Sequence, residues 1–383
     1  MLKQYLIKAG TVLSVRSGEQ RRADIRVVNG VVRQICSDMA PMEHEEVINA
    51  AGMLITTGWV DSHCHVGVDP DGIGIKPMEY LLSQGTTYAV DAGTAGADTF
   101  ELFRKLVRYR SDLQYRAYLN LGSTGMHDSR KDTERPEDID TDAIAAVCAK
   151  YPKEILGLKI RIDPNFCFDP KYVLKQARML ADNLGLSVAV HAPRCPLPLE
   201  TVLSYLVKGD VFAHTLAGIV PGMTIIDESG HLKTCVKEAQ DRGVIFDLSH
   251  GTNQFSYKVA ESAWKDGFVP AIISSDLHHS NIRGPVFNLA AVMTKIKGIT
   301  NLDWLEIIRK VTVRPVELLG LEDKQLDIQI GAPADLTIFT VENGSFTYLD
   351  STEQARTCTE RLNVQYTCLN DYVYCSRESL REV

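Results

Sequence analysis

The chain has 383 residues, of which 45% are hydrophobic and 23% charged, and its formal net charge at pH 7 is −8. This length is sufficient for one large domain and a smaller one. The acidic balance and the lack of a basic stripe exclude a general nucleic-acid binder, and no apolar run approaches the roughly 20 residues that a membrane-spanning helix needs.

The first fifty-odd residues contain short β-type runs, namely Tyr5–Ile7, Asp24–Val28 and Val31–Ile35. Asn29-Gly30, between the last two runs, is a strong hairpin signal. A similar run, Ala334–Phe339, follows a Gly-Ala-Pro turn, and β-type sequence continues to Tyr374. We therefore expect residues 1–55 and 327–383 to pair with each other as one small β-sandwich.

The central residues, 56–326, alternate between apolar strand candidates and helical patterns. The eight strand candidates are Trp59–Val60, Tyr88–Val90, Ala117–Leu121, Leu156–Ile162, Ser187–Val190, Val211–Ala213, Val244–Leu248 and Ala271–Ile273. The clearest helix has Asp169 as its N-cap and stops at Gly185, and the other helical candidates are Gln254–Trp264 and Asp303–Leu319. Eight strands that are each followed by a helix predict an α/β fold, a (β/α)8 TIM-type barrel.

Two loops of this barrel are long, Ser123–Thr141 after the third strand and Leu216–Ser229 after the sixth. Either loop could be a lid over the catalytic face or a solvated excursion without a role.

Histidines close several of the apolar runs. His63 and His65 are two residues apart on the first strand, so both side chains point the same way and could bind one ion. Asp276 follows the eighth strand, which neighbours the first in a closed barrel, and would add a carboxylate. His191 and His214 end the fifth and sixth strands and would form a second metal site. Each signal alone is typical of an ordinary structural residue, but together they predict bound metal.

Lys159 ends the fourth strand at the same level. An ammonium group between two divalent cations would be strongly repelled. A lysine fits there if its amine is neutral, or if CO2 converts it to a carbamate, which is anionic and can bridge two ions. The residues themselves leave both states open.

Substrate contacts are expected from Arg161, Arg194, Arg283 and His250. The three arginines indicate a carboxylate on the substrate, because guanidinium binds carboxylate in a bidentate manner. The alternative is that they pair with structural carboxylates such as Asp163. His250 ends the seventh strand and is expected to face the site.

With these residues in place, the chain resembles the amidohydrolase superfamily over nearly its whole length. The segments Gly58–His65 and Gly331–Phe339 carry the resemblance, and the ordered set of ligands is similar to that of dihydroorotase, hydantoinase and urease. This resemblance implies two divalent ions, usually zinc, bridged by a carbamate on Lys159.

Gly157–Arg161, Ser275–His278 and Gly284–Phe287 look like a bacterial group labelled dihydroorotase or deacetylase, which implies hydrolysis of acyl amides or esters of small hydroxy or amino acids. Dihydroorotases carry an arginine two residues after the second histidine, where this chain has Gly67. The absence of that arginine removes a main support for cyclic ureide hydrolysis.

The expected mechanism is attack by a hydroxide shared between the two ions, with Asp276 taking its proton and passing it to the leaving atom. The alternatives are a cyclic amide hydrolase, a purine-type deaminase with one ion, and a non-catalytic binding protein. We expect a small-molecule substrate, no nucleic-acid or membrane partner, and exposed faces that could support a homo-oligomer. The nine cysteines are scattered singly and no signal-peptide segment is evident, so a cytoplasmic location is expected.

Overall fold

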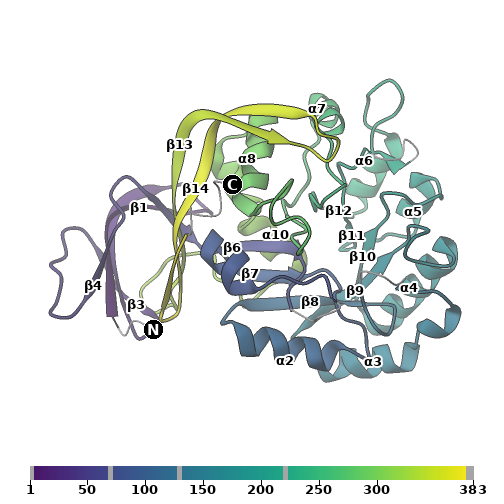
Figure 1. The fold of residues 1–383 in the computed structure, drawn as a ribbon, viewed down its shortest axis with the longest axis horizontal. Helices are drawn as coiled ribbons and strands as arrows, with labels where there is room; N and C mark the ends of the chain where they lie inside the picture. The colour runs from purple at the N-terminus through teal and green to yellow at the C-terminus, as the bar shows by residue number, and fades with distance from the viewer. Residues whose placement is uncertain (1–3, 68–71, 127–131, 219–222, 377–383) are drawn as a thin grey trace.

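The structure, a computed structural model, describes residues 4–67, 72–126, 132–218 and 223–376. Two units lie side by side, an α/β unit built on a parallel sheet and a β-rich unit to which both ends of the chain contribute (Figure 1). Within these ranges no disulfide forms, and no helix is both long and apolar enough to cross a bilayer.

The β-rich unit is one mixed sheet of eight strands in the order β15-β14-β13-β5-β1-β2-β3, with β4 paired to β1. Its strands are β1 (Gln4–Leu13), β2 (Gln20–Val28), β3 (Val31–Cys36), β4 (Glu46–Asn49), β5 (Leu54–Thr57), β13 (Asp335–Leu349), β14 (Ala355–Leu369) and β15 (Tyr372–Cys375). The antiparallel pairing of β5 with β13 joins the two ends of the chain, as the sequence predicts.

This sheet curls back on itself. Asn29 and Gly30 have φ angles of 51° and 70° and form the predicted turn between β2 and β3. The N–H of Val32 in β3 then donates to the carbonyl of Ala332, just before β13, at 2.9 Å. The expected sandwich is therefore a single curled sheet around one apolar core.

The α/β unit contains a parallel sheet of seven strands in the order β12-β11-β10-β9-β8-β7-β6. These are β6 (Trp59–Cys64), β7 (Thr86–Asp91), β8 (Gln114–Asn120), β9 (Ile155–Arg161), β10 (Ser187–His191), β11 (Val211–Phe212) and β12 (Ile245–Phe246). The eighth predicted strand appears as a segment, Ala271–Leu277, with single bridges to both ends of the sheet. These bridges join Asp247 to Ile272 and Cys64 to Leu277.

The parallel sheet curves around its own apolar cluster, to which six of its seven strands and the segment Ala271–Leu277 contribute buried side chains. They include Val60, Tyr88, Tyr118, Ala189, Val211, Ile245 and Ile272. Because the two ends of the strand order share this cluster, the carboxyl ends of the strands are brought to one place.

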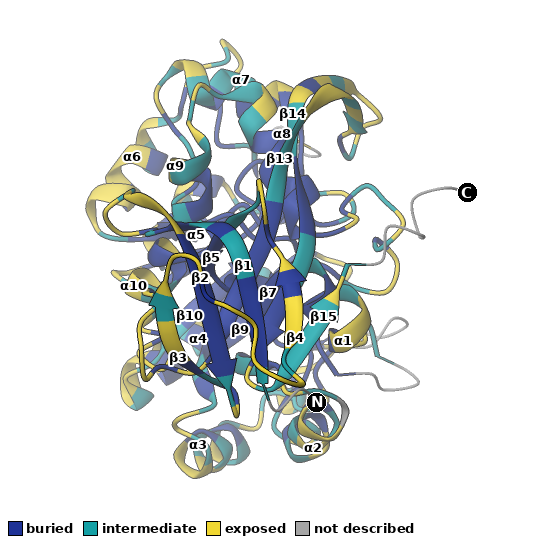
Figure 2. Ribbon diagram, turned by 90° about the vertical axis from the view of Figure 1, so that its left-hand side faces the viewer, coloured by how far each residue is buried: buried dark blue, intermediate teal, exposed yellow. Residues whose placement is uncertain are grey.

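The helices are α1 (Pro77–Tyr80), α2 (Phe100–Arg110), α3 (Thr141–Lys150), α4 (Pro170–Leu184), α5 (Leu199–Ser204), α6 (Thr234–Asp241), α7 (Tyr257–Lys265), α8 (Leu289–Ile299), α9 (Trp304–Arg309) and α10 (Val313–Leu319). Figure 2 shows that α3 and α6 expose their outer faces, whereas β7 is buried along its length. The prediction for α4 is confirmed: the Asp169 carboxylate accepts from the N–H groups of Lys171 and Tyr172, and Gly185 ends the helix in a left-handed conformation.

Two helix predictions need correction. Asp303–Leu319 is two helices, α9 and α10, because Pro315 has no N–H and the Val311 carbonyl accepts from Val60 N–H at 2.8 Å. The helix predicted from Gln254 starts at Tyr257, because the N–H of Ser256 donates to Leu216 instead.

The hairpin of β13 and β14 extends from the β-rich unit across the α/β unit towards α7 and α8 (Figure 1). In its turn, the Asp350 carboxylate accepts from the N–H of Tyr257 at 2.9 Å. The C-terminal strands therefore contact the loop that follows β12, at the carboxyl edge of the parallel sheet.

Candidate metal centre

Six side chains predicted from the sequence meet at the carboxyl ends of the parallel strands, and each is at most 7% exposed: His63, His65, Lys159, His191, His214 and Asp276. His63, His214 and Asp276 place possible metal-binding atoms within 4.8 Å of one another, the one such cluster among the described residues.

The Asp276 carboxylate links His63 of β6 with His65, which follows that strand. Its Oδ1 lies 3.2 Å from His65 Nε2 and 3.6 Å from His63 Nε2. His63 Nε2 is also 3.3 Å from Lys159 Nζ. On the other side of the centre, His191 Nδ1 and His214 Nε2 are 2.7 Å apart.

The two histidines of the first strand are held from outside the centre by hydroxyl groups. Thr94 Oγ1 donates to the Asp91 carboxylate at 2.7 Å, so at 2.9 Å from His65 Nδ1 it accepts the imidazole proton. Ser249 Oγ donates to Asp247 at 2.7 Å and lies 3.0 Å from His63 Nδ1. Both histidines therefore keep the lone pair of Nε2 for the centre.

The other two histidines are oriented in the same manner. His214 Nδ1 donates to the Ser249 carbonyl at 2.7 Å, which leaves the lone pair on Nε2. His191 Nε2 is 3.3 Å from an oxygen of Asp163 but forms no hydrogen bond within the described part of the chain. Asp163 is itself held by the N–H of Arg194 at 2.9 Å.

Four inward-facing nitrogens and a carboxylate suit a cation. Two imidazole lone pairs only 2.7 Å apart, as in His191 and His214, repel each other unless a proton or a metal ion lies between them. Burial and the neighbouring positive charges lower the pKa of His63, His191 and His214 well below the usual range. Neutral imidazole with a fixed outer partner is the form that binds divalent metals.

Lys159 projects into the same space. Burial lowers the pKa of its amine to about 8, with the Asp276 carboxylate acting against this shift and Arg161 adding to it. Gly93 passes directly over the stem of the lysine, since a Cβ at residue 93 would lie 2.5 Å from Lys159 Cβ. The amine is thus far more often neutral near pH 8 than an exposed lysine would be.

Backbone strain accompanies the site. His214, Ser249 and Asp276 have φ angles of 58°, 41° and 51°, a left-handed region that residues other than glycine rarely adopt. Gly251 lies against Asp276, because a Cβ there would be 2.6 Å from Oδ2. Such conformations persist where the surrounding contacts fix them, and they are common at functional sites.

Arg161 stands beside the centre but is already paired. Its guanidinium binds both oxygens of Asp132, one of them at 2.8 Å, and stacks on the ring of Phe166 at 3.7 Å. The Asp132 carboxylate also accepts from Asn120 at 3.0 Å. Arg161 is therefore paired with a carboxylate that the sequence did not single out, and its contact with a substrate stays a prediction.

The other predicted substrate contacts are two exposed arginines and one buried histidine. Arg194 and Arg283 are exposed side chains in the loops after β10 and after the segment Ala271–Leu277. His250 is fully buried, with Nδ1 at 2.8 Å from the Gly251 carbonyl and Nε2 at 2.9 Å from Lys295 Nζ. Both ring nitrogens of His250 thus face protein groups.

The two long loops lie partly outside the described residues, at 127–131 and 219–222. The described part of the first is anchored, since Asp132 N–H donates to the Phe166 carbonyl at 3.0 Å.

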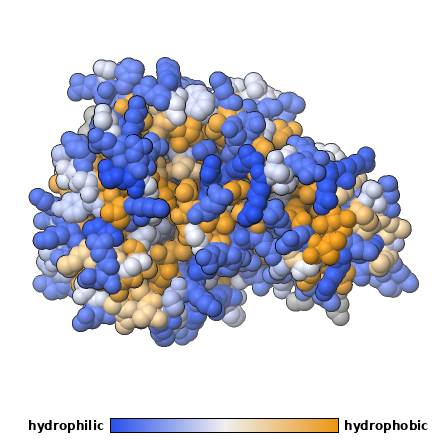
Figure 3. Space-filling model, turned by 180° about the vertical axis from the view of Figure 1, so that it is seen from behind, coloured by the Kyte–Doolittle hydropathy of each residue, from blue (hydrophilic) through white to orange (hydrophobic). Residues whose placement is uncertain are grey.

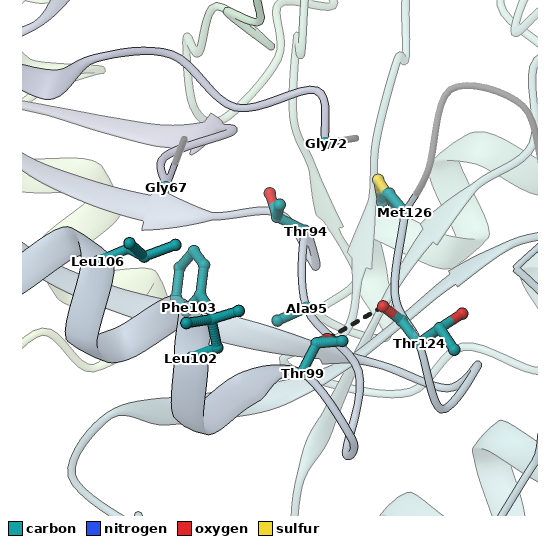
Figure 4. A pocket seen from close by; sticks show the side chains of 10 residues that line it. All are labelled: Gly67, Gly72, Thr94, Ala95, Thr99, Leu102, Phe103, Leu106, Thr124 and Met126. Atoms are coloured by element: carbon teal, nitrogen blue, oxygen red, sulfur yellow. Dashed lines mark hydrogen bonds between the residues drawn. The ribbon is translucent and has the colours of Figure 1, made fainter. Parts of the chain in front are cut away.

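An apolar pocket adjoins the outer partner of His65 (Figure 4). Thr94 forms part of its wall with Ala95, Thr99, Leu102, Leu106, Thr124, Met126 and other residues. The hydroxyl of Thr99 donates to the Thr124 carbonyl at 3.0 Å and Thr94 Oγ1 is used by Asp91, so the pocket offers mainly apolar surface.

The outer partners Asp91, Thr94, Asp247 and Ser249 were not singled out from the sequence. Asp91 ends β7, so the strand-end rule that selected the ligands could have found it. Thr94 and Ser249 lie in loops and carry no such signal.

The comparisons with known proteins agree with this geometry. The model of the amidohydrolase family matches residues 54–370. A deacetylase from Agrobacterium fabrum is 31% identical over 343 residues, which cover 88% of this chain and 83% of the relative. A deacetylase from Brucella anthropi is 32% identical over 318 residues, which cover 82% of this chain and 77% of the relative.

Solved structures are similar over almost the full length. A structure described as a dihydroorotase has a TM-score of 0.89 and 28% identity, covering 98% of both chains. One described as an adenine deaminase has a TM-score of 0.84 and 27% identity, covering 97% of this chain and 99% of the other. From its sequence match, its fold and its cluster of histidines, lysine and aspartate, this chain belongs to the amidohydrolase family and is a hydrolase that acts on carbon–nitrogen bonds.

Proposed function

We propose that this enzyme removes an acyl group, such as acetyl, from the amide or ester of a small carboxylate-bearing compound, as a deacetylase-type hydrolase. The observation that carries the proposal is the convergence of four histidines, three of them with an outer hydrogen-bond acceptor, around the carboxylate of Asp276 and the amine of Lys159. The deacetylase relatives support the choice of bond.

In this proposal Ala271–Leu277 is the eighth strand of a closed (β/α)8 barrel formed by residues 56–326, and residues 1–55 and 327–383 form the second domain. His63, His65 and Asp276 would hold one divalent ion, and His191 and His214 a second. Lys159 would lie between them as a carbamate formed from CO2. Zinc suits imidazole and carboxylate donors, and such ions supply a water-derived nucleophile near neutral pH.

The chain's own residues then orient and move protons. Asp276 Oδ1 lies close to the Nε2 atoms of His63 and His65, where it can accept a proton from the attacking water and return it to the leaving nitrogen or oxygen. Burial of the centre keeps bulk water away and strengthens the electrostatic interactions there.

The arginines at the rim of the site, Arg161, Arg194 and Arg283, are the reason for proposing a carboxylate on the substrate. The guanidinium groups of Arg194 and Arg283 are exposed, whereas that of Arg161 is paired with Asp132. Arg194 stands three residues beyond His191, and its charge acts on that histidine. We therefore assign the substrate carboxylate to Arg194 and Arg283, with Arg161 holding the loop that carries Asp132.

Cyclic amide hydrolysis is the second candidate, because a structural neighbour is described as a dihydroorotase. Gly67 weighs against it. With φ of +100° and only 2.8 Å from a Cβ to the ring of Phe103, residue 67 has no room for the arginine that dihydroorotases carry there. The adenine deaminase neighbour keeps deamination as a further alternative, which Lys159 at the centre disfavours.

The test is an activity screen of protein loaded with zinc, manganese or cobalt and bicarbonate. N-acetyl and O-acetyl acids, dihydroorotate and adenine would be compared, with acetate, ring-opened product and ammonia measured separately. The proposal expects acetate release. Release of ammonia from adenine, or ring opening without any acetate release, would contradict it.

The proposal places the enzyme in the cytoplasm, with a small-molecule substrate and no nucleic-acid or membrane partner. A homo-oligomer is also proposed, because Met42 and Val47 of the β-rich unit are exposed at 52% and 42%. Figure 3 shows hydrophobic side chains gathered among hydrophilic ones at that end of the molecule. Light scattering of the purified protein measures the oligomeric state directly.

A further inference from the structure

Lys295 is a fully buried lysine on α8, with 0% of its surface exposed. Its Nζ lies 2.9 Å from His250 Nε2, 2.7 Å from the Pro285 carbonyl and 2.8 Å from the Leu349 carbonyl. An ammonium group has three N–H donors, and here each has one acceptor. Buried lysines are rare unless paired, so three matched acceptors from three separate segments mark a specific junction.

The surroundings of this ammonium are otherwise weakly charged. The ring of Phe255 lies 5.8 Å from Nζ. Burial lowers the pKa of Lys295 to about 7, while the Asp350 carboxylate acts in the opposite direction. The junction therefore depends on hydrogen bonds to fixed acceptors and not on a salt bridge.

His250 transmits the position of Lys295 to the loop after β12. Because the Gly251 carbonyl can only accept, the imidazole proton of His250 lies on Nδ1, and Nε2 is left to accept from Lys295. The ring also stacks on Phe255, with centroids 4.5 Å apart. The orientation of His250 is thus fixed on three sides.

The segment Ser249–Gly251 touches three of the candidate metal ligands. The Ser249 carbonyl accepts from His214, its hydroxyl bonds to His63, and Gly251 packs against Asp276. Ser249 is also in the left-handed region of φ, a conformation that its neighbours must maintain. Contacts that hold Ser249–Gly251 in place therefore also hold the three ligands His63, His214 and Asp276 in place.

The hairpin of the β-rich unit completes the support. Leu349 is the last residue of β13, and the next residue, Asp350, bonds to Tyr257. Ser351 N–H donates to the Phe255 carbonyl at 3.0 Å, and Ser351 Oγ accepts from the Phe255 N–H at 3.1 Å. The turn of the hairpin and Lys295 together hold both ends of the loop that runs from Ser249 to Tyr257.

We propose that Lys295 is a positioning residue for the metal centre, which ties the β13–β14 hairpin to Ser249–Gly251 and so fixes the orientation of His63 and His214. The β-rich unit thereby contributes to metal binding without supplying a ligand. This inference rests on the metal centre of the proposed function but not on its substrate.

The experiment measures the affinity of the metal-stripped full-length protein for zinc alone, by competition with a chromophoric chelator. Lys295→Met is compared with Lys310→Met, a control in which a partly buried lysine donates to a single carbonyl, that of Pro270, at 2.6 Å. A pair variant, Lys295→Met with His250→Phe, removes donor and acceptor together and so limits the loss of folding stability. Hydrogen exchange of the amides of residues 248–252 is measured without metal.

We expect zinc affinity to fall about tenfold or more in Lys295→Met and in the pair variant, as for other outer supports of metal ligands, and by less than about threefold in Lys310→Met. Exchange at 248–252 should accelerate in the first two variants only. The proposal is overturned if affinity follows the unfolding midpoint alone across all three variants, if the pair variant regains normal affinity, or if the wild-type protein binds no zinc. Zinc binding without acyl hydrolysis would sink the proposed function and leave this inference standing.

Discussion

The metal centre and the rim around it are built on different rules. In the centre, three histidines have one nitrogen facing inward and the other bonded to an outer acceptor, and the residues lie at or near the carboxyl ends of the parallel strands. On the rim, one arginine is closed off by Asp132 and two others extend into solvent from loops. Under the proposed function, the residues near the strand ends would set the chemistry and the loop arginines would select the substrate.

The substitution with the largest expected effect on activity is Asp276→Asn, which keeps the size of the side chain but removes the proposed general base. Turnover of the acetylated acid should fall about a thousandfold with little change in KM, because proton transfer is lost while substrate binding is not. Steady-state kinetics on protein with verified metal content measures this. Turnover near that of the wild type would show that Asp276 is not the base.

The outer partners of the centre should matter less than Asp276 itself. Thr94→Val removes the acceptor of His65 Nδ1, and zinc affinity should fall about 10–100-fold. Thr99→Val is the matched control, since Thr99 lines the same pocket but donates to the Thr124 carbonyl. Equal affinities in the two variants would contradict the assigned role of Thr94.

Lys159 gives the centre a pH dependence that the rim lacks. With a pKa of about 8, its amine goes from about one-tenth neutral at pH 7 to about nine-tenths neutral at pH 9. Only the neutral amine reacts with CO2, so reconstitution with zinc at a fixed CO2 concentration should be about tenfold faster at pH 9. The histidine pKa values lie well below this range, so the histidines stay neutral throughout. A rate that is flat or falls with pH would rule out carbamate formation as the limiting step.

Substitution of the rim arginines should have a small effect on KM, and only for substrates that carry a carboxylate. Arg194→Ala and Arg283→Ala should each raise KM for a carboxylate substrate no more than about fivefold, because exposed ion pairs contribute about 1 kcal/mol or less. KM for the matched methyl ester should not change. If acids and esters respond alike, the cations of the rim do not select the substrate.

The sequence predicts the centre well for a physical reason. An apolar run that ends in histidine or aspartate predicts a strand, and it also predicts that the last side chain lies at the carboxyl edge of the sheet. His191, His214 and Asp276 could therefore be placed at that edge from the sequence alone. The role expected for Lys159, a carbamate between two metal ions, comes from the family resemblance. The same reasoning predicted eight parallel strands, seven of which form the parallel sheet, and the pairing of the two chain ends.

The rest depends on contacts that leave no local pattern. Asp132 reaches Arg161 across 29 residues of sequence, from a loop without periodicity. The break after α9 depends on a carbonyl used by Val60, far away in the chain. Lys295 could have been noticed in the sequence, because it is the charged residue in the otherwise uncharged stretch Ala290–Ile296. Every residue of this stretch is buried.

The pairing of β5 with β13 has a consequence for biosynthesis. The ribosome delivers Leu54–Thr57 before the α/β unit and its partner strand, Asp335–Leu349, only after that unit. At 5–20 residues per second the first strands wait on the order of a quarter of a minute to a minute with an open edge. Open strand edges are templates for aggregation. A nascent chain therefore needs chaperones most while the α/β unit is being made, and the synthesis of β13 ends this period.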